Sequence, residues 1–458
     1  MRYINSLNYD STGRGRLRPG DVKGWLMITV SMAAVLFNWN TVSARSLGTI
    51  LLQVEKESPA LLAAEEAVAV RRAGVKIVKS RYLGEVDAVV KNSTFNDKRL
   101  INPIGYPLNL QPDLFDNNQI GYGLRAKLPL DINGRIGAQL EAARQLQKAS
   151  KAQKRDVRLR LLYSAAALYH GIEGILAEEN ALRHQIQALD SHIQTTEAAI
   201  KAEQEIPVKK MRLITERDDV MGSLAALKGQ EQRLRAGLAA LLAARSFPDS
   251  LSPIHILPPE TAWKEEMIEQ RPDIMAFKAR INSSRAFRRA ARDSRLPKMA
   301  VDGSWIQNQG YNGENGDNWT LSVQVGMPLW DGGGRRAEVA KSSAGVRMLQ
   351  QKLAALRYQA RSELISARAA WNAATARYQA ALASGKAAAE TARIQENRFT
   401  EGQISADNLV DAEAALSKAE SGKAVALTDL WKAGDSIRFA LGREPALYPG
   451  RQTVSHKR

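Results

Sequence analysis

Apolar and polar residues alternate along residues 319–329, and this period of two predicts a β-strand with two unlike faces. From 334 to about 401 the spacing changes, and apolar or small residues recur every three or four positions, as in a helix. A proline and three glycines separate the two patterns. Proline cannot donate to a central ladder, and glycine adopts backbone states that other residues avoid. We therefore predict a strand-to-helix junction that contains Pro328, Trp330, Gly332, Gly333 and Gly334.

The same order of elements occurs earlier in the chain. Residues 129–135 repeat the junction in a shorter form, which keeps Pro129 and Gly134 but has a single glycine. Two such junctions in order, each followed by a long helix and a returning helix, indicate a duplicated unit. We predict a first repeat at 45–245 and a second at 264–443. Between and after them we place a linker at 246–263 and a C-terminal tail at 444–458.

Each repeat is expected to hold two strands and two long antiparallel helices. In the first repeat the strands are predicted at about 84–98 and 119–130, and the helices at 135–204 and 207–245. In the second repeat the strands are predicted at about 298–308 and 318–329, and the helices at 334–401 and 405–441. Ala and Leu recur along these helices at coiled-coil spacing, which lets neighbouring helices approach closely. The fold class is therefore α+β, with long coiled-coil hairpins attached to a few strands.

Four strands in one chain constrain any role in a membrane. In a bilayer every backbone group must be paired, and single-chain barrels begin at about eight strands. Subunits would therefore have to share a barrel. Several aromatic residues lie in or beside the strands: Tyr82, Phe95, Tyr122, Trp305, Trp319 and Trp330. They suit the aromatic girdle of a barrel, although aromatics are also enriched in the cores of ordinary sheets.

The N-terminal residues have the order of features found in an export signal. Basic residues between Arg14 and Lys23 precede the apolar run 25–37, and the small residues at 42–44 suit a signal peptidase. We therefore predict a signal peptide at 1–44. The run is too short to span a bilayer as a helix, and no other run approaches the roughly 18 apolar residues that are needed.

Charge and cysteine content exclude several classes of protein. Lysine and arginine outnumber acidic residues 65 to 48, which gives a net charge of +17. The charges are spread along helices without a basic cluster interleaved with aromatics, so nucleic acid is not an expected partner. Anionic lipid or another anionic partner stays open as a ligand for some of them. The absence of cysteine excludes disulfides, thiolate metal sites and a lipid anchor on an N-terminal cysteine.

At this point the chain resembles the TolC-like outer-membrane factor family. The resemblance rests on the motifs Arg271-Pro272-Asp273-Ile274, Leu296-Pro297, residues 328–333, Arg398-Phe399 and Asp411-Ala412. It covers nearly everything after the export signal. The family implies a homotrimer whose subunits each give four strands to one twelve-strand β-barrel in the outer membrane, continued by an α-helical tube in the periplasm. It also implies an exit duct for an efflux pump or type I secretion system, with a periplasmic adaptor and an inner-membrane transporter as partners.

The family also implies a narrowing at the periplasmic tip, made by rings of aspartate. The usual positions fall on Asn408 and Asp411, while Asp407 sits one place earlier. Asp407 and Asp411 share a helix face, and in a trimer each would form a ring of like charges that favours cations. The alternative is two solvated carboxylates near the start of a helix, where the dipole favours them. An arginine–tyrosine latch known in some relatives is absent, because Ile404 and Phe399 stand at those places. We hypothesise that Lys209, Lys210 and Arg212 pair with the aspartates.

Other chemistry is poorly supported by the sequence. The five histidines show no ligand spacing backed by a carboxylate, and no phosphate-binding loop or nucleophile elbow is present. We therefore predict no catalytic residue, no cofactor and no metal site, and a protein that is not an enzyme. The competing hypothesis is an exported periplasmic coiled-coil scaffold or adaptor without a membrane barrel. Membrane fractionation with a trimer assay separates the two.

Overall fold

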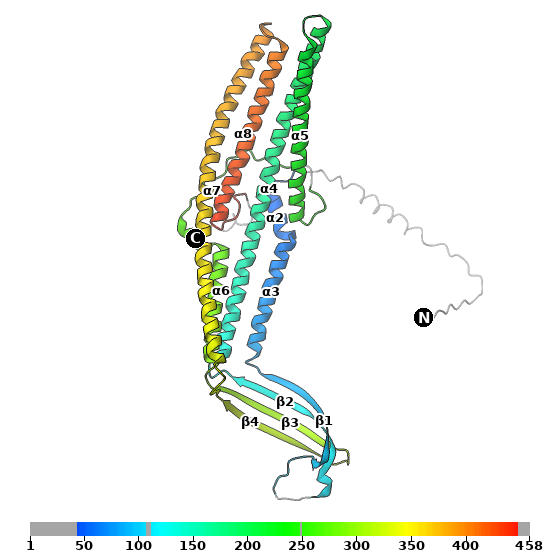
Figure 1. Ribbon diagram of the computed structural model, residues 1–458, viewed down its shortest axis with the longest axis vertical. Helices are drawn as coiled ribbons and strands as arrows, with labels where there is room; N and C mark the ends of the chain where they lie inside the picture. The colour runs from blue at the N-terminus through cyan, green and yellow to red at the C-terminus, as the bar shows by residue number, and fades with distance from the viewer. Residues whose placement is uncertain (1–43, 107–110, 248–249, 448–458) are drawn as a thin grey trace, which may run out of the picture. The chain divides into compact units, whose positions relative to one another are not determined.

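The computed structural model describes residues 44–106, 111–247 and 250–447. The predicted signal peptide, apart from Ala44, and the tail beyond 447 lie outside the described residues. From Arg45 onward the described elements belong to one compact unit. A short helix α2 (Leu47–Glu57) precedes two copies of the same element order, which can be followed by colour in Figure 1.

The two repeats match helix for helix. The first repeat runs α3 (Pro59–Ser80), β1 (Glu85–Leu100), β2 (Phe115–Leu130), α4 (Arg135–Lys201) and α5 (Pro207–Leu241). The second repeat runs α6 (Pro272–Asp293), β3 (Lys298–Gly310), β4 (Asn315–Gly326), α7 (Gly334–Thr400) and α8 (Ala406–Ala440). The corresponding helices are 22, 67 and 35 residues long in both repeats. Short 3₁₀ turns lie at Pro112–Leu114 and Glu265–Gln270.

The helices form a layer in which the two longest, α4 and α7, each pack against shorter ones. Near the strands α4 contacts α3 and α6, and further along it contacts α5 and α8. The helix α7 contacts α6 and α8. Alanines fill the seams: Ala142, Ala165, Ala360 and Ala374 are all buried, which allows the close approach expected of a coiled coil. Every helix tested in the described ranges is too short or too polar to cross a bilayer.

The α2 helix packs against α4 and lies between the end of α3 and the end of α5 (Figure 1). One buried cluster joins residues of α2, α4 and the end of α5 with its C-cap, namely Leu47, Ile50, Leu51, Val54, Leu162, Tyr169, Ile172, Leu238 and Leu242. The hydroxyl of Tyr169 donates to the carbonyls of Arg45 and Ser252, so both the residues just ahead of α2 and the inter-repeat linker are held against α4.

The four strands make one antiparallel sheet in the order β1-β2-β3-β4. The central pairing of β2 with β3 joins the two repeats, while β1 and β4 have no further partner in the described part of the chain. All four strand-to-helix connections leave from the same end of the sheet, since neighbouring strands are antiparallel and the helices flank each hairpin.

The strand bounds differ from the predicted ones because pairing, rather than composition, decides where a strand ends. We predicted a last strand at 318–329, but β4 ends at Gly326, whose partner Lys298 is the first residue of β3. The residues 309–317 lie between the two strands predicted at 298–308 and 318–329, yet Asn315 pairs with Gln309, so both strands extend into this stretch and leave only a tight turn. Likewise β2 begins at Phe115, opposite Leu100 of β1, after a register shift between Thr94 and Arg99.

The helix ends differ by at most four residues from the predicted ones. The helix predicted at 135–204 ends at Lys201, because Glu203 adopts a left-handed backbone with φ of 60°. The helix predicted at 207–245 ends at Leu241, ahead of Ala243 with φ of 51°. A residue with a side chain rarely adopts this region, so neither reversal could be read from the helical spacing. The helices predicted at 334–401 and 405–441 run over 334–400 and 406–440.

Candidate functional site

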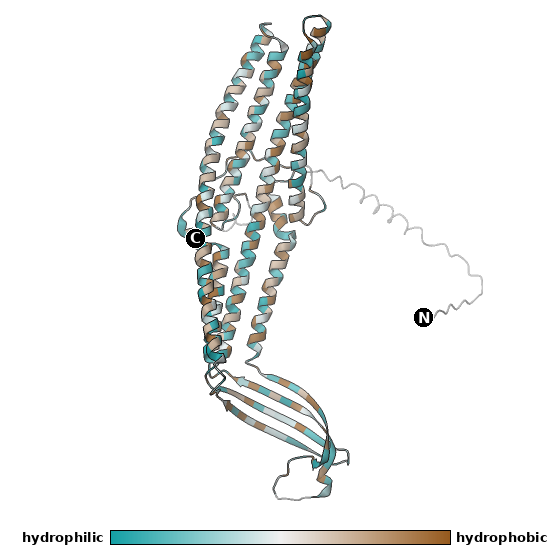
Figure 2. Cartoon of the chain, in the orientation of Figure 1, coloured by the Kyte–Doolittle hydropathy of each residue, from teal (hydrophilic) through white to brown (hydrophobic). Residues whose placement is uncertain are grey.

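The sheet has one apolar and one polar face. Facing positions across the register put Leu124 beside Trp305 and Trp305 beside Trp319, with Leu321 opposite Gly303. These side chains are exposed, and Trp319 is 72% accessible. Brown and teal residues alternate along the strands in Figure 2. No described element covers the apolar face, and an uncovered apolar surface of this kind on a sheet marks an interaction with lipid or another protein.

The opposite face of the sheet carries the charges. Asp87 lies across from Arg125, and Glu85 lies across from Lys127, which in turn faces Asp302 of β3. Opposite charges therefore neighbour each other along this face, an arrangement that stabilises cross-strand pairs. A sheet that is apolar on one side and charged on the other suits a wall between lipid and water.

The first strand-to-helix junction is organised by Asp131, two residues after Pro129. Its carboxylate accepts hydrogen bonds from the backbone nitrogens of Ile136 at 2.8 Å and Gly137 at 2.7 Å, which are free donors in the first turn of α4. The hydroxyl of Tyr82, at the end of α3, donates to the same carboxylate at 3.0 Å. Asp131 therefore ties the start of α4 and the segment that follows α3 to the junction.

The second junction uses the equivalent Asp331 in a looser way. Its carboxylate accepts from the backbone nitrogens of Gly333 at 3.2 Å and Arg335 at 2.9 Å, and pairs with the Arg335 guanidinium at 3.1 Å. Gly332 and Gly333 have φ of 63° and 88°, while the first junction needs only Gly134, with φ of 73°. Gly334 is the first residue of the helix, so two of the three glycines are required by the backbone.

The capping role of Asp131 and Asp331 was missed from the sequence. Asp131 and Asp331 each lie four residues before an arginine in the first turn of the following helix. An acid at this distance from a helix start is the signal that could have revealed the capping role. Within the second junction, Leu329 and Trp330 are each 89% exposed and lie three and four residues past the end of β4. Pro328 lies just past the end of β4, where no ladder hydrogen bond is lost.

At the far end of the helices, His192 of α4 contacts both predicted pore aspartates of α8. Its Nδ1 lies 2.8 Å from Asp407 Oδ1, and its Nε2 lies 2.9 Å from Asp411 Oδ1. Each ring nitrogen thus lies within hydrogen-bonding distance of one carboxylate oxygen, and the imidazole bridges two aspartates that are one helical turn apart. The His192 side chain is nearly buried, whereas that of Asp411 is 71% exposed. Asn408, the other predicted pore residue, is exposed beside them.

The three predicted partners of these aspartates are arranged differently. Lys209 pairs with Glu205 at 2.8 Å, and Lys210 pairs with Glu197 at 3.1 Å, while Arg212 is exposed. The Lys209 pKa is raised, mainly by its hydrogen bond to Glu205, with a smaller contribution from Asp407. Within one chain the two lysines therefore fasten the α4–α5 turn, because acids of their own hairpin are nearer, and the lysine–aspartate pairing stays a hypothesis.

A second histidine of α4, His170, also lies between two carboxylates. Its Nδ1 is 3.4 Å from Glu173 and its Nε2 is 3.5 Å from Asp435 of α8, and the side chain is fully buried. Burial alone would lower the pKa of His170, but the contacts with Asp435 and Glu173 outweigh it and raise the pKa above the ordinary 6.5. The ring stacks on Trp431, with centroids 5.8 Å apart.

The two carboxylates of this buried cluster also hold peripheral segments of the chain. Glu173 accepts a hydrogen bond from the backbone nitrogen of Ile254 in the linker at 2.8 Å. Asp435 accepts one from Ala446, beyond the end of α8, at 3.0 Å. Within the described ranges, no group of three or more acidic or histidine side chains is arranged to hold a metal ion. The His170 cluster is thus a structural ion network that fastens the linker and the C-terminal segment.

The Arg271 motif at the start of the second repeat has a structural role as well. The buried guanidinium pairs with Asp273 at 2.9 Å and with Glu363 of α7 at 2.7 Å, and donates to the carbonyl of Ala440 at the end of α8 at 3.2 Å. Arg271 therefore fastens three helices. A bidentate guanidinium suits this task better than the point charge of lysine.

Comparison with known proteins identifies the family. The model of the outer membrane efflux protein family matches residues 50–202 and 263–443, which leaves out α5 and most of the linker between the repeats. This match covers well over half of the chain, and the protein therefore belongs to the outer membrane efflux protein family. The matched residues include both junctions, His192 with its two aspartates, and the Arg271 motif. The predicted resemblance to the TolC-like outer-membrane factors is confirmed.

Individual relatives are distant. The chain is 22% identical to the outer membrane protein OprJ of Pseudomonas aeruginosa over 271 residues, which is 55% of either protein, so it spans about half the length of this relative. A crystal structure of a membrane protein from Pseudomonas aeruginosa superposes with a TM-score of 0.73 at 20% identity, covering 90% of this chain and 92% of that one. The outer membrane protein VceC of Vibrio cholerae gives 0.70 at 17% identity, with 87% and 96% covered. The α+β fold of long helices and strands is thus shared.

Proposed function

We propose that this protein is the outer-membrane exit channel of a tripartite efflux pump. Three copies would each contribute four strands to a twelve-strand barrel in the outer membrane, and their helices would continue it as a tube in the periplasm. A periplasmic adaptor and an inner-membrane transporter would deliver the substrate, and the channel would conduct it passively. No step of this role is catalytic. The description of the family as outer membrane efflux proteins supports the proposal.

The single observation that best supports the proposal is the four-stranded sheet. Its apolar face is uncovered in the described part of the chain, its other face is charged, and both edge strands are unpaired there. Long unpaired strand edges promote aggregation, so proteins avoid them. In a lipid bilayer no backbone group at such an edge could find a hydrogen-bond partner. Closure with further copies removes the edges and places the apolar face in lipid.

The helix layer favours the same kind of closure. Within one chain, α4 of the first repeat packs on α6 and α8 of the second. By the correspondence of the repeats, α7 is the counterpart of α4, and α3 and α5 are the counterparts of α6 and α8. Apolar side chains remain exposed on α3 and on α7, the helices at the two outer sides of the layer. Among them are Val70 and Ile77 of α3 and Ile365 of α7. The free side of α7 can therefore pack on α3 and α5 of the next copy, which generates a ring.

The contacts of His192 support a closed state at the periplasmic tip. They fix Asp407 and Asp411 of α8 against α4, while most of the Asp411 side chain remains accessible. In a trimer, three such aspartates at a narrowing would resist anions and hold cations. Replacing the side chain in Asp411→Ala is expected to raise the single-channel conductance in planar bilayers. An unaltered conductance would remove Asp411 from the gate.

Fractionation of cells that express the chain, combined with cross-linking, tests the proposal. The expected result is a trimer that sediments with the outer membrane and is extracted only by detergent. A soluble periplasmic monomer would instead support the exported coiled-coil scaffold or adaptor without a barrel.

A further inference from the structure

Basic residues are concentrated at the helix ends that adjoin the sheet. We define the cationic collar as residues 70–83, 131–155, 280–298 and 331–352, which are the parts of α3, α4, α6 and α7 nearest the strands together with their connections. These 80 residues contain 23 lysines and arginines but 5 acids, a net charge of +18. This exceeds the net charge of +17 of the whole chain.

The opposite helix ends have the reverse balance. Residues 178–219 and 386–423, also 80 in number, contain 11 lysines and arginines and 16 acids, a net charge of −5. The acids of this end include the two aspartates held by His192. The basic excess is therefore not a general property of these long helices. It belongs to the end at which all four connections to the sheet are made.

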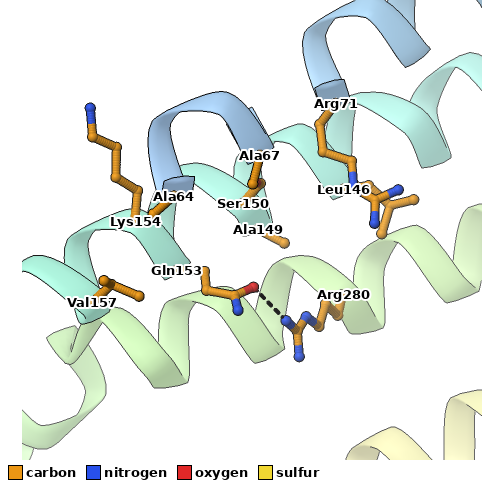
Figure 3. A pocket seen from close by; sticks show the side chains of 10 residues that line it. All are labelled: Ala64, Ala67, Arg71, Leu146, Ala149, Ser150, Gln153, Lys154, Val157 and Arg280. Atoms are coloured by element: carbon orange, nitrogen blue, oxygen red, sulfur yellow. Dashed lines mark hydrogen bonds between the residues drawn. The ribbon is translucent and has the colours of Figure 1, made fainter. Parts of the chain in front are cut away.

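Acids of the collar cannot neutralise it. Among the described contacts, Asp331 pairs with Arg335 and Glu338 with Lys341, while Lys154 pairs with Glu65 just outside the collar. Cations from three helices even line one common cavity of about 160 Å³, to which α3 contributes Arg71, α4 contributes Lys154 and α6 contributes Arg280 (Figure 3). The Arg280 guanidinium donates to a neutral group there, the Gln153 amide oxygen, at 2.7 Å. So many like charges in proximity need an external anion.

The position of the collar identifies that anion. Passing from the sheet to the helices, the apolar face of the strands is followed by exposed apolar residues at the connections, namely Trp330 and, at the sheet-side edge of the collar, Leu83 and Ile132. The cations of the collar come next. An apolar surface, then an aromatic residue and then cations follow the same order as the hydrocarbon core, the interface and the headgroups of a bilayer. Lysines and arginines just outside a bilayer attract anionic lipid.

We propose that the cationic collar binds anionic phospholipid headgroups on the periplasmic face of the outer membrane. The inference rests on the proposed function, since it needs the sheet to lie in that membrane. Binding there would hold the barrel at a fixed depth and brace the connections at Asp131 and Asp331, which lie within the collar.

The test compares two variants with the same change in charge. The collar variant combines four substitutions of exposed residues: Arg72→Gln, Arg289→Gln, Arg292→Gln and Arg336→Gln. The control variant combines four exposed substitutions near the opposite end: Lys386→Gln, Arg398→Gln, Lys418→Gln and Lys423→Gln. Each purified protein is reconstituted into bilayers of phosphatidylglycerol and phosphatidylcholine in equal parts with identical acyl chains. It is then extracted in mild detergent, and the retained lipids are quantified by mass spectrometry.

The wild type and the control variant are expected to retain phosphatidylglycerol enriched by about twofold or more over the bilayer ratio, and the enrichment should fall with added salt. In the collar variant the ratio should return to that of the bilayer. No enrichment in the wild type, or equal loss in both variants, would overturn the inference. Lipid retention that is unchanged in the collar variant while its ion selectivity shifts would place these cations on the channel lumen and also overturn it.

Insertion is measured first in pure phosphatidylcholine, which keeps the two proposals separable. A protein that fails to insert or to form trimers there refutes the proposed function itself. A protein that inserts as a trimer but retains phosphatidylglycerol without preference refutes only the lipid inference.

Discussion

Two histidines of α4 make the same kind of bridge to α8, but in different surroundings. His170 lies between Glu173 and Asp435 with its side chain fully buried. His192 lies between Asp407 and Asp411, and the Asp411 side chain is 71% exposed. The first bridge is surrounded by Trp431, the linker and the C-terminal segment, whereas the second stands near the free end of the helices.

The difference teaches how one chemical arrangement can serve two purposes. A buried charged pair is costly to break, because removal of one partner leaves an uncompensated charge in a medium that cannot solvate it. When the carboxylate of a pair is exposed to solvent, water can take over its contacts, and the pair contributes little to stability. The His170 bridge is therefore suited to permanent fastening, and the His192 bridge is suited to a contact that opens.

The largest effect is expected for His170→Gln. The substitution leaves Glu173 and Asp435 buried with no cation between them, and the free energy of unfolding should fall by about 3–5 kcal/mol. Denaturant unfolding of the purified protein in detergent measures it. As a control, Asp435→Asn removes one carboxylate and keeps the cation paired with Glu173, so it should cost less. A loss below that of the control would contradict the assignment of a buried charged bridge.

The next effect is a dependence of stability on pH. The pKa of His170 is raised above 6.5 in the folded chain, so its proton is held more tightly there than in the unfolded chain. The stabilisation is therefore complete below pH 6.5 and is lost as the pH rises through the folded pKa. The charged groups that face it are Glu173 and Asp435, with Arg438 beside Asp435. The melting temperature should fall with rising pH above 6.5 in the wild type, and a His170→Gln curve with the same slope would sink the explanation.

The sequence shows much of this architecture but none of these bridges. The spacing of Ala and Leu along α7 and α8 determines the helical hairpins, because helix neighbours suffice to bury such faces. The end of β4 could not be predicted from its own residues, since β4 ends at Gly326 only because its partner Lys298 is the first residue of β3. His192 and Asp411 are 219 residues apart and meet only because α4 packs on α8. The sequence offers no local spacing from which that contact could be inferred.

A smaller effect on stability, but a visible one on transport, is expected for His192→Gln. Because Asp411 is largely exposed, the free energy of unfolding should change by about 1 kcal/mol or less. The uncharged glutamine no longer holds both aspartates against α4, so the conductance of the reconstituted channel should rise. A large loss of stability with unchanged conductance would reverse the roles assigned to the two histidines.

The smallest effect is expected for Lys210→Glu. Lys210 pairs with Glu197 across the α4–α5 turn and does not contact the aspartates, so reversal of its charge should leave the conductance of the closed channel as it is. Planar-bilayer recordings of the variant beside the wild type provide the comparison. A clear rise in conductance would restore Lys210 as a partner of Asp407 or Asp411 and displace His192 from that role.

The central claim is that copies of this chain close into a channel through the outer membrane. The most direct measurement is the current through planar bilayers to which the purified protein has been added as a cross-linked trimer, recorded for the wild type and for His192→Gln. The account predicts discrete, long-lived current steps for both proteins, with larger steps for the variant. Trimers that insert but pass no current, or a protein that never leaves the monomeric state, would contradict it.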